Sequence, residues 1–237
     1  MNIVNMMRYL LLILTLGLLG CEALRETIRE TASPVTEEEV IRGLRQALEF
    51  GAEEASDQAS DEGGFYENAR LRIPFPEEVQ QVEEALRNLG LNSLVDDFIR
   101  QLNRSAENAA AEAAPIFISA IQNITIRDGL DILHGSNNAA TQYLYGQTSG
   151  DLTSAFRPVI EQALSETQTT RYWEQITSRY NQIPFVEPVE TDLAAYTTNH
   201  AIDGLFLLIE EEEREIRNNP GARATDLLRR VFGEQDG

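Results

Sequence analysis

Two histidines of this chain each have an aspartate one helical turn away, a spacing that suits general acid–base chemistry. Asp131 precedes His134 by three residues, and Asp203 follows His200 by three. On a helix such neighbours share a face, where the carboxylate can orient the imidazole as a base. The spacing is also common on solvated helices, and neither histidine lies in a Gly-x-Ser-x-Gly nucleophile motif. We therefore expect no catalytic residue and keep a hydrolase only as a lower alternative.

The composition excludes several other kinds of site. The chain has 237 residues, with 39 acidic and 19 basic side chains and a formal net charge of −20, and every basic residue is arginine. Without lysine there is no Schiff-base or phosphate-loop amine. One cysteine and two histidines cannot build a CxxC pair or a three-histidine zinc site. These absences predict no metal and no cofactor. A strongly negative surface also repels phosphate backbones, so we expect no nucleic-acid partner.

Charged residues near the carboxyl terminus form a second candidate site. The run Glu210 to Glu213 is spaced four residues from Arg214 and Arg217, which predicts a solvated helix face with ion pairs. Together with Arg223, these arginines concentrate positive charge in an acidic chain. Arginine forks bind carboxylates and phosphates, so Arg214, Arg217 and Arg223 are candidates for binding a partner, with surface ion pairing as the alternative.

Aromatic residues form a third candidate. Five of the seven tyrosines and the only tryptophan lie between residues 143 and 196. Aromatic side chains at helical spacing usually fill a core. They also line pockets, where an apolar body and a polar tip suit a lipid-like ligand. The candidate ligand-binding residues are Tyr143, Tyr172, Trp173 and Tyr180.

The amino terminus has the pattern of a targeting signal. Arg8 precedes an apolar run from Tyr9 to Leu19, which is too short to span a bilayer, and Gly20 and Cys21 follow. This arrangement resembles a bacterial lipoprotein signal. The resemblance implies that residues 1–20 are removed and that the Cys21 sulfur is lipidated, with acyl chains such as palmitate anchoring the protein to a membrane.

The residue after Cys21 bears on the location. Glu22 differs from the aspartate associated with inner-membrane retention, which favours the periplasmic side of the outer membrane in a diderm envelope. Residues 21–35 are polar, contain the breaker Ser33-Pro34 and read as a tether. The membrane is then a partner through the lipid anchor.

Helical periodicity runs through the rest of the chain, and no alternating strand pattern appears. Residues 36–237 therefore predict one all-α domain of amphipathic helices. Thr36 and Glu39 match a capping box, and Ile73-Pro74-Phe75-Pro76 must be extended. Pro115 either kinks a helix or starts the next. The expected helices cover about residues 36–62, 79–89, 94–114, 116–121, 125–133, 136–145, 152–164, 172–180, 193–216 and 220–232, with a loop from Gly146 to Gly150.

Several short segments of the sequence resemble motifs of one family. They are Ile73-Pro74-Phe75-Pro76, the segments 128–133, 138–143 and 201–206, and Ile216 to Pro220 followed by Leu227 to Gly233. Together they resemble DUF 4197, an all-helical family of bacterial envelope proteins. The resemblance implies a secreted or lipid-anchored helical domain and brings no activity, cofactor or catalytic residue.

These observations favour a non-enzymatic, lipid-anchored module that binds or scaffolds an envelope partner. The alternative is a carrier that holds an apolar or lipid-like ligand between its helices. A periplasmic hydrolase is the lower alternative.

Overall fold

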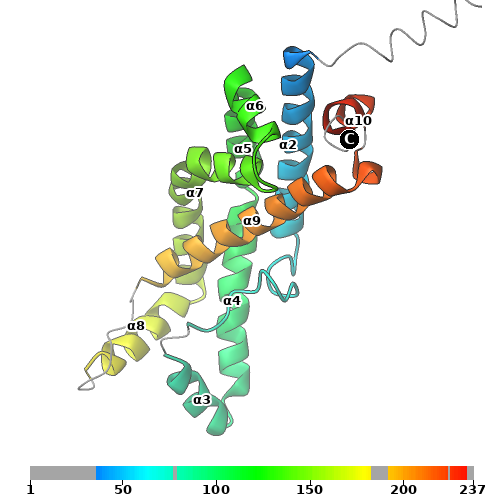
Figure 1. Ribbon diagram of the computed structural model, residues 1–237. Coiled ribbons are helices and arrows are strands. Elements are labelled where there is room, and N and C mark those ends of the chain that lie inside the picture. Colours follow the sequence, from blue (N-terminus) through cyan, green and yellow to red (C-terminus); the bar gives the residue numbers. More distant parts are fainter. Residues whose placement is uncertain (1–35, 77–78, 183–191, 224, 234–237) are drawn as a thin grey trace, which may run out of the picture. The chain divides into compact units, whose positions relative to one another are not determined.

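The computed structural model describes residues 36–76, 79–182, 192–223 and 225–233. All regular structure in these ranges is helical, and Glu37–Gly237 forms one compact unit, which confirms the all-α class (Figure 1). None of the described helices is both long and apolar enough to cross a bilayer. The elements are α2 (Glu37–Ser60), α3 (Gln80–Asn88), α4 (Asn92–Ala110), α5 (Ala113–Gln122), α6 (Ile126–Leu133), α7 (Ala139–Glu166), α8 (Thr169–Tyr180), α9 (Leu193–Asn218), the 3₁₀ turn η2 (Pro220–Ala222) and α10 (Asp226–Gly233).

Local signals set several helix ends. The Thr125 hydroxyl accepts the Asp128 N–H at 3.2 Å, and the Asp128 carboxylate accepts the Thr125 N–H at 3.0 Å, so a reciprocal capping box begins α6. Gly90 has a φ of +82°, which favours glycine, and it separates α3 from α4. Pro115 lies in the first turn of α5, which settles the alternative that the sequence left open.

Two expected boundaries are wrong. The predicted loop from Gly146 to Gly150 does not exist, because α7 continues through both glycines and through Pro158. Each glycine costs a helix only about 1 kcal/mol, and one face of α7 buries a long stripe of side chains that outweighs this cost. The stripe consists of Ala140, Thr141, Leu144, Thr148, Leu152, Phe156, Ile160 and Leu164.

The second wrong boundary is the start of the last helix. Asn219 accepts the Gly221 N–H at 3.0 Å and caps only the short turn η2. The helix itself begins at Asp226, where the Thr225 hydroxyl accepts the Leu228 N–H at 3.2 Å. The proline therefore opens a turn that precedes α10 and does not open α10 itself.

The core lies around α9, which packs against α7, α2 and α4. Its buried face carries Ala201, Leu205 and Leu208, each no more than 2% exposed. Gly204 lies on the same helix, and a Cβ there would come within 2.8 Å of the Phe65 ring. The glycine thus lets the loop after α2 insert an aromatic ring against α9.

Polar side chains of α4 hold that loop. The Asn103 amide accepts the Ile73 N–H and donates to the Ile73 carbonyl, both at 2.8 Å, so it pairs with both backbone groups of Ile73 as a neighbouring β-strand would. The Glu107 carboxylate accepts the N–H groups of Phe65 and Tyr66, each at 3.2 Å. Asn103 and Glu107 are buried, so these bonds fix the extended segment that ends in Phe75.

Candidate functional site

A groove opens where α3, α4 and α8 come together at one end of the helical body (Figure 1). Its volume is about 570 Å³, within the range of small-molecule sites. Half of its lining is apolar, and the polar remainder holds a single charged side chain. The lining residues are Phe75, Leu86, Leu94, Val95, Phe98 and Ile176, with Asp97, Gln101, Thr167, Thr169, Tyr172 and Gln175.

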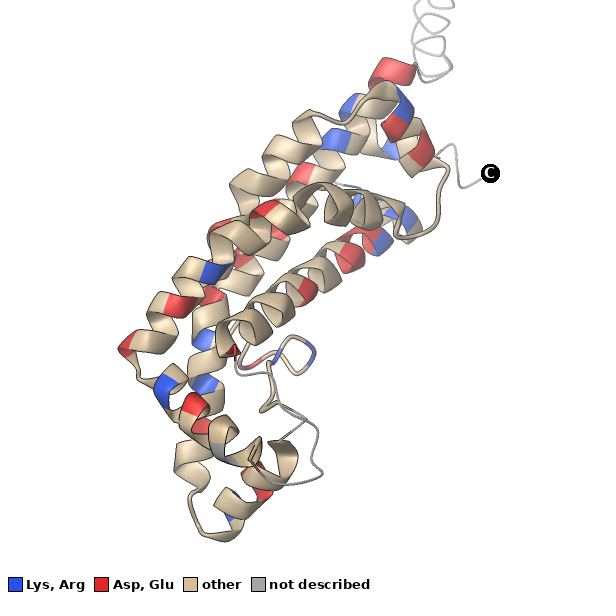
Figure 2. Ribbon diagram, turned by 90° about the vertical axis from the view of Figure 1, so that its left-hand side faces the viewer, with Lys and Arg blue, Asp and Glu red and all other residues tan. Residues whose placement is uncertain are grey.

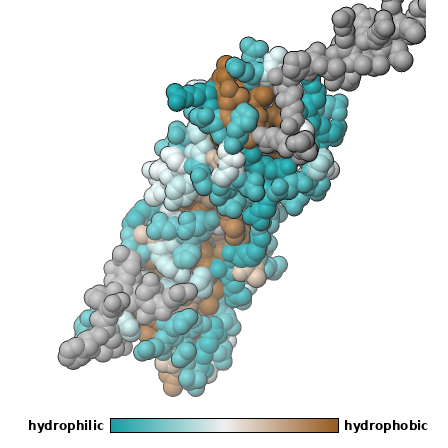
Figure 3. Space-filling view, viewed as in Figure 1, coloured by the Kyte–Doolittle hydropathy of each residue, from teal (hydrophilic) through white to brown (hydrophobic). Residues whose placement is uncertain are grey.

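The helix α3 explains why the groove stays open. Its sequence is strongly amphipathic, yet none of its residues is buried, and it packs mainly on α4. Leu89, at its end, is 75% exposed, and Leu94, in the first turn of α4, is 51% exposed. Figure 3 shows a small hydrophobic area at the lower tip, where Figure 1 places the turn between α3 and α4, and a larger one near the upper end. Leu94 thus exposes apolar surface in the lining of the groove.

An aromatic cluster forms one wall of the groove and packs into the core beneath it. The Phe75 and Phe98 rings, which line it, lie 5.1 Å apart, and Trp173 packs against them at 5.9 and 5.8 Å. Such spacings are favourable for aromatic pairs. Trp173 is 1% exposed, and its indole N–H has no hydrogen-bond partner among the described residues. Because Asn103 holds the segment that ends in Phe75, this cluster is tied to α4.

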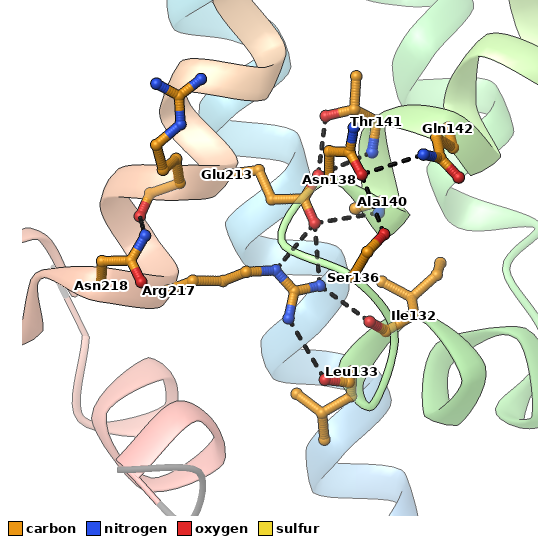
Figure 4. Close-up of polar contacts among 11 residues, drawn as sticks. Ile132, Leu133, Ser136, Asn138, Ala140, Thr141, Gln142, Glu213, Arg217 and Asn218 are labelled. Atoms are coloured by element: carbon orange, nitrogen blue, oxygen red, sulfur yellow. Dashed lines mark hydrogen bonds and ion pairs between the residues drawn. The ribbon is translucent and has the colours of Figure 1, made fainter.

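The other end of the body contains a buried ion pair (Figure 4). The Glu213 carboxylate of α9 accepts the N–H groups of Ala140 and Thr141 at 3.0 and 2.8 Å and the Thr141 hydroxyl at 2.8 Å. It therefore caps the first turn of α7, where Asn138 makes no side-chain cap.

Arg217 completes this junction. Its guanidinium lies 2.9 Å from Glu213 and donates to the carbonyls of Ile132 and Leu133 at the end of α6, at 2.8 and 3.3 Å. A single ion pair on α9 thus joins the end of α6 to the start of α7.

These contacts correct the interpretation of the charged run as a solvated face. The side chains of Glu213 and Arg217 are 5% and 7% exposed. Arg223 is 2% exposed and donates to the carbonyls of Ile216 and Arg217 at the end of α9. Arg217 and Arg223 are therefore not available to a partner. Of the three candidates for partner binding, Arg214 alone is exposed, 3.5 Å from Glu210.

Comparison with known proteins places the chain in a family. The model of a family described as proteins of unknown function, DUF4197, matches residues 34–233. The chain belongs to this family. A search of curated proteins and a search of solved structures each found no match.

The DUF4197 domain brings only part of the aromatic candidate set together. Tyr172 lines the groove and Trp173 packs beneath it, whereas Tyr180 is half-buried at the end of α8 and is not part of the lining. Tyr143 lies in a different cavity, of about 910 Å³, with Asp128 and polar residues of α5 and α7. Burial and the nearby Asp128 charge raise the pKa of Tyr143.

The lining residues Leu86, Leu94 and Phe98 were not among the candidates. Their only signal in the sequence is a stripe on α3 and early α4 that resembles an ordinary core face.

The remaining candidates of the DUF4197 domain have structural contacts or lie outside the description. The His134 ring nitrogen Nδ1 is 2.9 Å from the Leu130 carbonyl, and the His200 ring packs on Tyr196 at 4.4 Å. Within the described ranges, no three His, Cys, Asp or Glu residues are placed to hold a metal ion. Cys21 and the rest of residues 1–35 lie outside the described residues.

Proposed function

We propose that this DUF4197 domain is a non-enzymatic binding protein that holds an apolar, lipid-like ligand in the groove between α3, α4 and α8. The observation that carries the proposal is the groove itself, a cavity of about 570 Å³ beside a helix that buries none of its residues. Burying the accessible Leu94 and its neighbours against an acyl chain would contribute about 25 cal/mol per Å² of apolar area.

Binding a ligand is favoured over docking a protein through the arginines, because Arg217 and Arg223 are occupied inside the molecule. The carrier role, which was the alternative from the sequence, therefore moves ahead of the scaffold role. The polar side chains of the groove, such as Gln101 and Gln175, would orient a ligand head while the apolar walls hold its chain.

We extend the proposal to the location. The lipoprotein-like signal at residues 8–21 supports an anchor on Cys21 in the cell envelope, with Glu22 favouring the outer membrane. The start of α2 and the turn between α3 and α4, the two helices that contribute Leu86 and Leu94 to the groove, lie at opposite ends of the helical body in Figure 1. An anchored domain would hold its ligand away from the point where the tether meets α2.

Titration with an uncharged fluorescent probe tests the binding function. Residues 22–237, which hold the whole compact unit, should bind N-phenyl-1-naphthylamine and change the fluorescence of Trp173, the only tryptophan of the chain. Leu94→Gln should weaken probe binding about tenfold, because it removes roughly 1.5 kcal/mol of apolar contact. Ile126→Gln is the matched control: Ile126 is 46% exposed on α6 and should leave binding unchanged.

Native mass spectrometry of protein released gently from a secreting host gives a second readout. A reproducible extra mass that is lost on denaturation would identify the ligand. The function would be rejected if no mass accompanied the protein and the probe bound wild type and Leu94→Gln equally.

A further inference from the structure

Charge at the groove limits the kind of ligand head that it can accept, if the groove binds the proposed apolar chain. Asp97 is the single charged residue in the lining. It lies 2.6 Å from Arg100, one turn further along α4, so the two charges at the rim already satisfy each other. The pair is solvent-exposed, with side chains 63% and 53% exposed, so it is weak, but a charged head beside it would still have to compete with the partner already in place.

Two further arginines adjoin lining residues in the sequence, and only Arg87 is engaged: Arg171, which precedes Tyr172 on α8, is exposed and has no ion pair among the described residues. Arg87 follows the lining residue Leu86 and bridges Glu83 at 2.8 Å and Asp96 at 3.0 Å. An anionic head faces a further disadvantage, because the whole chain carries a formal charge of −20.

Neutral hydrogen-bonding groups, in contrast, are plentiful at this site. The lining includes Gln101, Gln175 and Tyr172, which carry two amides and a hydroxyl. They can donate to and accept from a hydroxyl, an ester or an amide. We infer that the groove selects an uncharged amphiphile, an acyl chain with a hydroxyl, ester or amide head, over an anion or a cation with the same chain.

Competition between three ligands of equal chain length tests this selectivity. Monomyristoylglycerol, ionised myristate and myristyltrimethylammonium would each displace N-phenyl-1-naphthylamine from residues 22–237. Measurement at about pH 8 keeps the carboxylate ionised, and low salt keeps exposed charges unscreened. The neutral ester should bind at least about fivefold more tightly than either ion, the scale of one unpaired charge near the surface.

Mirror variants assign the effect to the rim pair. Asp97→Asn frees Arg100 and should improve myristate binding about fivefold, whereas Arg100→Gln frees Asp97 and should improve binding of the cation by a similar factor. Neither variant should change the affinity for the ester. Asp57→Asn is the matched control, because it removes the same charge from an exposed residue of α2 that lies outside the lining.

Each other outcome has a defined meaning. If neither the probe nor any ligand binds, the proposed function itself fails. Equal binding of the three ligands would keep the function and overturn the selectivity. If the cation bound most tightly, the selectivity for an uncharged head would be overturned in favour of a cationic head. If myristate bound most tightly and Arg171→Gln abolished that preference, the selectivity would be overturned in favour of an anionic head. An equal response of Asp57→Asn and Asp97→Asn would show that the net charge of the protein, and not the Asp97–Arg100 pair, determines the selectivity.

Discussion

The junction of α6, α7 and α9 and the groove between α3, α4 and α8 hold opposite kinds of side chain in opposite environments. At the junction, Glu213 and Arg217 are buried and fully engaged with helix ends. At the groove, leucines such as Leu94 lie at the surface. Other charges are spread along the helices (Figure 2). The two regions therefore differ in role: the buried charges hold the helices together, whereas the exposed apolar side chains are accessible to a ligand.

Glu213→Ala should break the junction with the largest effect. Removal of the carboxylate leaves Arg217 buried without its counter-charge and the Ala140 and Thr141 N–H groups uncapped, which should lower the free energy of unfolding by about 3–5 kcal/mol in urea titrations. Glu210→Ala, in the exposed pair with Arg214, should cost at most about 0.5 kcal/mol. Equal losses for the two variants would contradict the structural role of the buried pair.

Asn103→Ala should affect both stability and the groove. The buried amide makes hydrogen bonds of 2.7–2.8 Å with Ile73 and Ile99, so its loss should cost about 2–3 kcal/mol. It should also loosen Phe75 and weaken probe binding, which folded Glu213→Ala should not do. Asn108→Ala, at an exposed position of the same helix, serves as the control for both measurements. Unchanged probe binding in folded Asn103→Ala would show that the clamp does not position the groove.

Thr125→Ala should cost about 1 kcal/mol by removing the cap of α6. Hydrogen bonds from the Thr125 hydroxyl and backbone N–H lower the pKa of Asp128. A lowered acid pKa adds stability that is present above the unfolded value and is lost as the pH falls through the folded value. The difference in melting temperature between the variant and wild type should therefore become smaller in acid, where only the loss of the bond from the Asp128 N–H remains. Thr153→Ala, exposed on α7, should show neither change.

Glu212→Gln should give the smallest effect, a stabilisation of about 0.3–0.5 kcal/mol at neutral pH. Burial raises the pKa of Glu212, and the charges of Glu54, Glu215 and Glu211 add to this shift. Ionisation above the raised pKa thus destabilises the fold, and the gain should vanish below the unfolded value. Thermal melts at neutral and acid pH measure it, with exposed Glu84→Gln as control. A destabilised variant at neutral pH would contradict this prediction.

The order of helices followed from the sequence because their signals are local. Thr125 and Asp128 are three residues apart, and a positive φ at Gly90 is a property of one residue. The continuity of α7 through Gly146 and Gly150 did not follow, because the stripe that outweighs the glycines depends on packing against α4, α5 and α9.

The site was less predictable than the fold. Tyr172 lines the groove, whereas Tyr143, a residue of the same type from the same candidate set, lines a different cavity. The four-residue spacing of Glu213 and Arg217 is identical in an exposed pair and a buried one. Their burial depends on helix ends far away in the sequence, and no spacing rule contains that information.

The junction also has a consequence for the timing of folding. Its hydrogen bonds connect residues that are 72 to 85 positions apart, from Ile132 and Thr141 to Arg217 and Glu213. A chain that is made from its amino terminus therefore lacks the partner of the last α6 carbonyls and the cap of α7 until residue 217 of 237 has been made. The contacts that hold α6 and α7 to α9 therefore form only after most of the chain has been synthesised.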